Sequence, residues 1–145
     1  MRYRAFVSDH ALSAAELLED LSEITNGLLY PSESDFPFRV FRWTAPTDVS
    51  PSAETVLLAL GRSPQTPVSH VALSDVFAGL TSAEPAASER DVEVASRFRA
   101  LQLLLESHLS DIRVFRVGAT DVDVFILGRH ASGHWVGLCT KTVET

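Results

Sequence analysis

The sequence predicts an α+β fold, in which helices cover a mainly antiparallel sheet. Two segments carry apolar residues at spacings of three and four, typical of helices that bury one face. The C-terminal third alternates apolar and polar residues instead, in three runs separated by short turns. Strands joined by short turns form an antiparallel meander, and the helices must bury their apolar faces on it. We therefore expect helices on both faces of the sheet.

The first helix is predicted to begin after Ser13, because Ser13 and Glu16 have the spacing of a capping box. The pair Asn26-Gly27 should end it, since both residues tolerate a left-handed backbone. Residues 1–12 have no clear period and are predicted to be an N-terminal arm or a short edge strand. One apolar face of the helix is predicted from Ala14, Leu17, Leu21, Ile24 and Leu28.

The middle of the chain is predicted to contain short elements separated by loops rich in proline and small polar residues. Residues 54–60 fit either a helix or a strand, and we prefer a helix. The remaining elements are expected as a loop at 28–37, a strand at 38–43, a connection at 44–52, a short strand at 68–73, a short helix at 74–80 and a loop at 81–88.

The longest helix is predicted for residues 89–109. Leu103 and Leu104 widen its apolar stripe, which otherwise comprises Val94, Phe98, Leu101, Leu105 and Leu109. Three strands should follow, at 112–117 with a turn near Gly118, at 122–126, and at 135–143 after a hairpin loop at 128–133. Because the last strand runs almost to the chain end, the terminal carboxylate is predicted to be held in a fixed place.

Composition limits the classes of function. The 145 residues fit one domain, and the net charge of −7 without any run of basic residues argues against direct nucleic-acid binding. An acidic surface suits a basic protein partner. No stretch is long and apolar enough for a membrane span, and no secretory signal is evident. The single cysteine excludes an internal disulfide and favours a cytoplasmic location.

Few residues have the spacing of a chemical site. No glycine-rich nucleotide loop is present. Asp121 and Asp123 share one strand face and form a metal or proton-sharing hypothesis, although a solvated strand face is the preferred interpretation. His130 and His134 flank a hairpin loop and give a weaker metal hypothesis. A nucleophile pair of Cys139 with His134 is also possible on paper, but a buried inert cysteine fits its apolar strand better.

Two segments resemble the nuclease A inhibitor family. The first is residues 26–43, with Gly27-Leu28-Leu29-Tyr30, then Ser32-Glu33-Ser34-Asp35-Phe36-Pro37-Phe38, and a strand ending in Trp43. The second comprises Val114-Phe115-Arg116-Val117-Gly118, Asp121-Val122-Asp123-Val124 and the terminal Thr140-Lys141-Thr142-Val143-Glu144-Thr145. Their order and separation also match. The resemblance covers residues 13–145 and is weaker between 44 and 91.

The resemblance implies a three-layer α/β/α sandwich, similar in shape to pathogenesis-related-1 proteins. It implies an inhibitor of a Mg²⁺-dependent ββα-metal nuclease that cleaves DNA and RNA alike, with no cofactor or metal of its own. The family's loop glutamate falls on Glu33 and its terminal threonine on Thr145, and both would reach the enzyme's catalytic metal region. Further partner-binding residues are expected at Glu84, Ser32, Asp35 and Glu144.

One part of the family pattern is absent. The family has an acid followed by tryptophan in the loop before the long helix, whereas this chain has Thr81-Ser82-Ala83-Glu84-Pro85-Ala86. An aromatic anchor is therefore missing there. Besides the inhibitor, two alternatives stay open. One is a non-catalytic binding module on the same fold with a different target. The other is a hydrolase that uses Asp121, Asp123 or His134.

Overall fold

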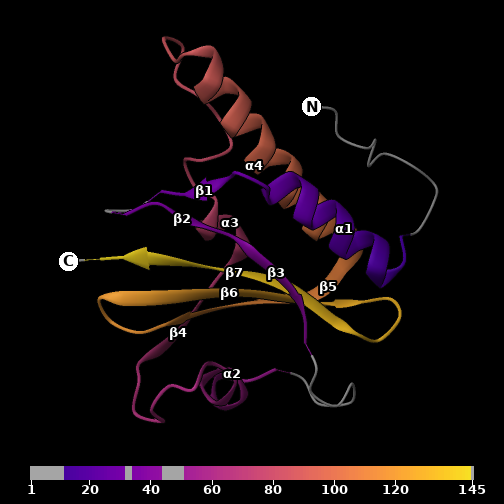
Figure 1. Cartoon of the computed structure of the whole chain (residues 1–145), viewed down its shortest axis with the longest axis vertical. Helices are drawn as coiled ribbons and strands as arrows, with labels where there is room; N and C mark the ends of the chain where they lie inside the picture. The colour runs from indigo at the N-terminus through magenta and orange to yellow at the C-terminus, as the bar shows by residue number, and fades with distance from the viewer. Residues whose placement is uncertain (1–11, 32–33, 44–50, 145) are drawn as a thin grey trace.

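A five-stranded antiparallel sheet forms the centre of the molecule (Figure 1). The computed structural model describes residues 12–31, 34–43 and 51–144. Within these, the strand order of the sheet is β3-β7-β6-β5-β4. Its strands are β3 (Arg39–Arg42), β4 (Val68–Val71), β5 (Leu109–Val117), β6 (Asp121–His130) and β7 (Trp135–Val143). The predicted C-terminal meander is confirmed, because β5, β6 and β7 are neighbours in the sheet.

Helices lie on both faces of this sheet. Helices α1 (Ala14–Thr25) and α4 (Glu89–His108) cover one face, together with the short α3 (Leu73–Val76). Helix α2 (Ala53–Leu60) lies under the opposite face. The expected mixed α+β class is therefore confirmed, and the preference for a helix at residues 54–60 was correct. The predicted arm at residues 1–12 lies outside the described residues except for its last member, Leu12, which is buried.

Local sequence explains where α1 begins and ends. The side chain of Ser13 accepts a hydrogen bond from the Glu16 amide, and the Glu16 carboxylate accepts one from the Ser13 amide. Asn26 caps the other end, and Gly27 then takes a left-handed φ of +76°. All five residues of the predicted apolar face, Ala14, Leu17, Leu21, Ile24 and Leu28, are buried.

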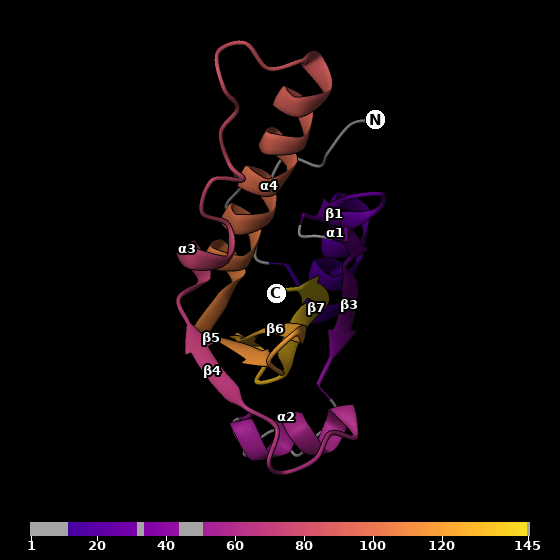
Figure 2. The same cartoon turned by 90° about the vertical axis from the view of Figure 1, so that its left-hand side faces the viewer.

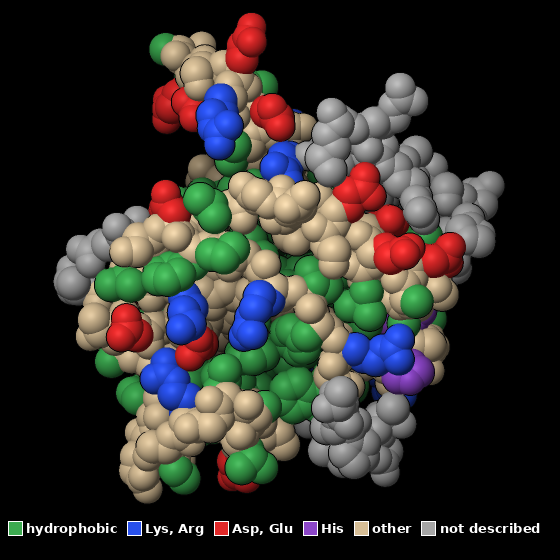
Figure 3. Space-filling model, viewed as in Figure 1, with side chains coloured by type: hydrophobic (Ala, Val, Ile, Leu, Met, Phe, Trp, Pro, Cys, Tyr) green, Lys and Arg blue, Asp and Glu red, His purple; other side chains and the backbone are tan. Residues whose placement is uncertain are grey.

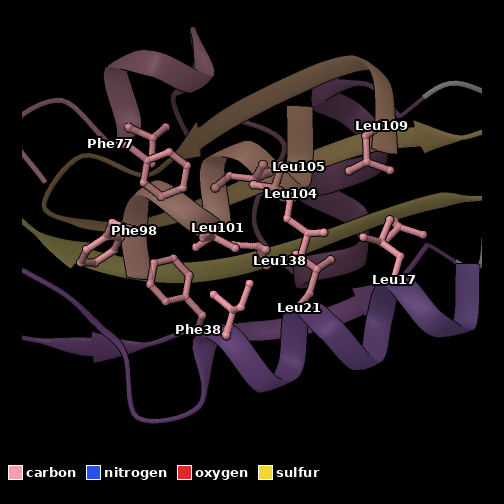
Figure 4. Packing of buried hydrophobic residues seen from close by; sticks show 14 of the residues in the cluster. Leu17, Leu21, Phe38, Phe77, Phe98, Leu101, Leu104, Leu105, Leu109 and Leu138 are labelled. Carbon is pink, nitrogen blue, oxygen red and sulfur yellow. The ribbon is translucent and has the colours of Figure 1, made fainter. Parts of the chain in front are cut away.

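The larger core lies between the sheet and the helices α1 and α4 (Figure 4). Leu17 and Leu21 from α1 and Leu101, Leu104 and Leu105 from α4 are fully buried there. Alternate residues of the central strands β6 and β7 belong to this core: Val122, Val124, Ile126, Val136 and Leu138. Burial of whole leucine side chains contributes on the order of 2 kcal/mol each, so this layer provides most of the apolar stabilisation. Leu103 does not belong to it, because its side chain is 51% exposed on the outer side of α4.

A smaller core lies on the face covered by α2. Its helical members are Val56 and Leu57, and the sheet contributes Phe115, Val117, Phe125, Leu127, Trp135 and Cys139. The period-two pattern therefore reports a sheet with two apolar faces in its central strands, as expected when helices cover both sides.

The boundary between α4 and β5 differs from the prediction. The chain passes from His108 directly into β5 at Leu109, so no separate linker precedes the strand. The register with β6 shifts between Ser110 and Arg113, and Asp111 adopts a φ of +52°. Such a β-bulge breaks the alternation of side chains, which explains why the period-two signal began only at Ile112.

The structure differs from the prediction at two further places, at Gly128 and in the predicted loop at 28–37. Gly128 lies inside β6 rather than in the hairpin loop, and a side chain there would collide with Leu109. The predicted loop at 28–37 contains a small antiparallel hairpin of β1 (Leu29–Tyr30) and β2 (Phe36–Pro37). Strands of two residues are too short to show a period.

The remaining elements agree with the prediction within a few residues. Helix α3 ends at Val76, where a run to Leu80 was predicted. Of the predicted connection at 44–52, only Pro51 and Ser52 lie within the described residues. No helix in the described part of the chain combines the length and apolar character needed to cross a bilayer.

Candidate partner-binding end of the molecule

The β1–β2 hairpin presents the loop that contains Ser32, Glu33 and Asp35. Tyr30 and Phe36 are paired across the hairpin, so the two strands hold the loop from both sides. The Tyr30 hydroxyl donates a hydrogen bond of 3.0 Å to the carbonyl of Val76. Burial raises the pKa of that hydroxyl, which remains a donor at neutral pH. Ser32 and Glu33 themselves lie outside the described residues, whereas Asp35 is described and exposed.

The hairpin is fixed to β7, the last strand of the chain. The Thr140 hydroxyl lies 2.9 Å from the carbonyl oxygen of Pro37 and 3.3 Å from that of Phe36, and it donates to this pair. The two views agree that the hairpin lies beside the C-terminal half of β7 (Figure 2). The fold therefore brings together two segments that are about a hundred residues apart in sequence.

Glu144, the last residue that the structure describes, is also fixed to the sheet. The amide of Glu144 donates a hydrogen bond of 2.9 Å to the carbonyl of Thr120. The Glu144 carboxylate forms an ion pair with Arg116 of β5. Glu144 does not project freely, because both its backbone and its side chain are held. The charge of Arg116 also lowers the pKa of Tyr30, which opposes the effect of burial there. Thr145 lies outside the described residues.

A cleft of about 310 Å³ lies between the hairpin and the α3–α4 connection. Asp35 lines it from the hairpin side and Glu84 from the other side, so the structure brings these two predicted residues together. Asp91 from the first turn of α4 is a third carboxylate in its lining. Leu29, which is 46% exposed, contributes apolar surface to the same cleft. Glu144 is not part of this lining.

The link between hairpin and last strand can be tested with a matched pair of threonines. Thr140→Val should leave two carbonyl groups without their donor and cost about 1 kcal/mol of folding free energy, or roughly 3 °C in Tm. Binding of a protein partner at this end of the molecule should weaken by more than this small loss of stability explains, because the hairpin is less firmly fixed. The measurements are thermal melting and a binding titration with that partner.

The control is Thr142→Val. Thr142 is buried on the same strand, and its hydroxyl makes no hydrogen bond to any residue that the structure describes. Its replacement should leave both readings nearly unchanged. Equal effects of the two substitutions would contradict a specific anchoring role for Thr140.

The acidic pair on β6 has a structural explanation. Arg62 donates to the Asp123 carboxylate at 2.9 Å and 3.3 Å, and it donates to the carbonyls of Asp121 and Val117. Asp123 therefore serves as the partner of an arginine that fastens the α2–β4 loop to the β5–β6 turn. Within the described residues, no group of three or more His, Cys, Asp or Glu side chains could hold a metal ion. A hydrolase that uses Asp121 or Asp123 receives no support from this arrangement.

The histidines and the cysteine also have structural partners. Ser132 lies between His130 and His134, with its hydroxyl 2.9 Å and 3.0 Å from the two Nδ1 atoms. The other ring nitrogen of His130 lies 2.7 Å from the carbonyl of Leu12. Cys139 is buried beside Arg39, and burial raises the pKa of its thiol. A raised pKa disfavours the thiolate that a nucleophile needs, so the structure supports the inert cysteine.

Comparison with known proteins agrees with the resemblance seen in the sequence. A family model described as nuclease A inhibitor-like protein matches residues 15–145, which is most of the chain. Comparison with curated proteins gave no match. The matched region includes both the hairpin and the C-terminal strand to which Thr140 fixes it. The chain belongs to the nuclease A inhibitor-like family.

Proposed function

We propose that this protein inhibits a Mg²⁺-dependent, sugar-non-specific nuclease of the ββα-metal class by occluding its active site. Glu33 and Thr145 would approach the catalytic metal, and Ser32, Asp35, Glu84 and Glu144 would contact the surrounding surface. The observation that supports the proposal is the pair of hydrogen bonds from Thr140 of β7 to Phe36 and Pro37, because they fix the β1–β2 hairpin beside the last strand of the sheet. The protein itself would be non-catalytic.

The chemistry of such an inhibitor is simple. Mg²⁺ binds hard oxygen ligands and keeps positions open for the phosphate oxygens of a substrate. A carboxylate on a loop and the terminal oxygens of the chain can replace those phosphate oxygens without offering a bond to cleave. The anchored hairpin would lose little conformational freedom on binding, which favours affinity.

The loop before α4 would contact the partner differently from the family pattern. The tryptophan that the family places before the long helix is missing, and a cleft lies there instead, lined by Asp35 and Glu84. Loss of an aromatic anchor reduces affinity for a partner that has a pocket for it. The cognate nuclease would therefore carry a different surface opposite this region.

The same proposal includes the expected fold and location. The protein would be a single domain with a three-layer sandwich fold, similar in shape to pathogenesis-related-1 proteins, and it would be cytoplasmic.

The direct test is a titration of the purified chain into a ββα-metal nuclease at saturating Mg²⁺, with DNA and RNA substrates in parallel. We expect cleavage of both substrates to fall together, because one active site serves both. A nuclease of another catalytic class is the control and should stay active. If a folded chain leaves every ββα-metal nuclease active, the alternative of a binding module with another target replaces this proposal.

Association should depend strongly on salt. The net charge of −7 would attract the basic cleft of a nucleic-acid enzyme. At physiological ionic strength, charges farther apart than about 8 Å are largely screened, so added salt should lower the association rate constant and change the dissociation rate constant little. Stopped-flow or surface-based kinetics over a salt series measures both constants.

Two cleft carboxylates provide the control for this salt effect. The double substitution Asp35→Asn and Glu84→Gln removes two negative charges from one cleft. It should make the association rate constant less sensitive to salt. A rate constant that does not vary with salt in either protein would exclude electrostatic steering.

A further inference from the structure

A second groove lies between β3 and α2 and is not used by the proposed inhibitory function. We call it the α2 groove; it has a volume of about 520 Å³. Phe41, Trp43 and Phe125 line it from the sheet, and Thr55, Leu58 and Ala59 line it from α2. Figure 3 shows hydrophobic side chains gathered in a hollow between the sheet and α2, with basic side chains along its upper edge.

The groove exists because α2 is short and β3 is the outermost strand. Val56 and Leu57 of α2 pack under the middle strands, whereas Phe41 of β3 and the following Trp43 are only partly buried at the margin of that cluster. Phe41 lies opposite Gly137 of β7, which has no side chain, and its ring contacts Phe125 at 5.2 Å between centroids. The sheet side of the groove is therefore a row of aromatic rings.

The α2 side of the groove is an apolar stripe that the core does not use. Thr55, Leu58 and Ala59 have spacings of three and four, so they share one face of α2. Leu58 is 82% exposed, the highest value among the large hydrophobic residues exposed in the described part of the chain. An exposed leucine side chain is unfavourable in water, and a ligand in the groove would cover it.

The charge at one end of the groove selects the ligand. Arg39 and Cys139 are cross-strand partners that line the groove together, and an Arg39 guanidinium nitrogen lies 3.5 Å from the Cys139 sulfur. Among the described residues, Arg39 forms no ion pair with a carboxylate. A guanidinium binds carboxylate or sulfonate groups through two parallel hydrogen bonds. We infer that the α2 groove binds a flat aromatic anion, with the rings between Phe41, Trp43 and Leu58 and the acidic group at Arg39.

The test compares two dyes with the same rings. Anilinonaphthalene sulfonate carries an anionic group, and phenyl-naphthylamine is its uncharged parent. Both become fluorescent in apolar sites, so each can be titrated into the folded full-length protein. We expect the sulfonate to bind at one site per chain and about tenfold more tightly than the parent, which corresponds to about 1.4 kcal/mol. Equal affinities would overturn the inference.

Substitutions locate the binding site and test separately the contacts to the acidic group and to the aromatic rings of the ligand. Arg39→Gln should remove the preference for the anionic dye, and Arg39→Lys, which keeps the charge, should retain much of it. Leu58→Glu should weaken both dyes about fivefold or more, because it replaces an apolar wall with a charge. Leu103→Glu is the matched control, since Leu103 is an exposed leucine on α4 that does not line the groove.

These outcomes do not depend on the proposed inhibition. Leu58 is a surface residue, so its substitution should leave the melting temperature nearly unchanged, and the comparison remains valid even if an arginine variant fails to fold. Binding that survives Leu58→Glu, or that Leu103→Glu weakens equally, would place the dyes elsewhere and overturn the inference.

Discussion

Replacing Glu33 by alanine is expected to weaken nuclease inhibition about thirtyfold or more while leaving the melting temperature unchanged. A central contact of an interface is worth about 2 kcal/mol or more when truncated, which corresponds to that factor. Glu33 belongs to the loop between β1 and β2, and Tyr30 and Thr140 fix the strands on its two sides. The described residues that flank it, Pro31, Ser34 and Asp35, are exposed, so the folded state should tolerate the change. Inhibition constants and thermal melting of the two proteins provide the comparison.

Two controls separate a metal-directed glutamate from a general charge effect. Glu33→Gln keeps the size of the side chain but removes the charge, and it should lose nearly as much inhibition as Glu33→Ala. Glu106→Ala removes one exposed acid from α4, on the helix rather than at the hairpin, and should lose little. A folded Glu33→Ala protein that inhibits as well as the original would remove Glu33 from the proposed site.

Much of the fold could be predicted because its elements are long and periodic. Helix α1 has both a capping box and an uninterrupted apolar face, and each of the strands β5, β6 and β7 is nine or ten residues long. The errors fall where the physical signal is interrupted. The bulge at Asp111 shifts the alternation within β5, and β1 and β2 are too short to show one. Leu103 fits the apolar stripe of α4 by spacing, but the sheet does not reach that side of the helix.

The candidate site was harder to predict, because its organisation depends on long-range contacts. Glu33 and Thr145 were chosen from the family resemblance, and the sequence pattern alone did not distinguish them. Thr140 appears in the sequence as an ordinary strand residue, yet its hydroxyl joins the hairpin to the last strand. No sequence pattern indicates a role for Arg116 either, although it forms an ion pair with Glu144 and its charge lowers the pKa of Tyr30. Asp35 and Glu84 are far apart in sequence and meet only at a cleft that the fold creates.

Changes at Thr145 are expected to cause the second large loss of inhibition. Deleting Thr145, or fusing a tag after it, should reduce inhibition at least tenfold and leave thermal stability unchanged. The reason is that the preceding residue is held at two points, by the Thr120 carbonyl and by Arg116. A terminal group attached to a fixed residue loses little entropy on docking, so it can contribute as much as a central contact. A frayed chain end would instead tolerate the loss of one residue.

Four variants distinguish these two accounts of the chain end. Removal of Thr145 tests the terminal residue, and a C-terminal tag tests access to it, whereas an N-terminal tag of equal size controls for bulk. Arg116→Gln keeps Thr145 but releases one of the two contacts that hold Glu144. It should therefore cause an intermediate loss of inhibition, because the terminal oxygens remain present but are less well placed. Equal inhibition by all of them would exclude a metal-capping role for Thr145. The partner would then meet another surface of the protein, as expected of a binding module with a different target.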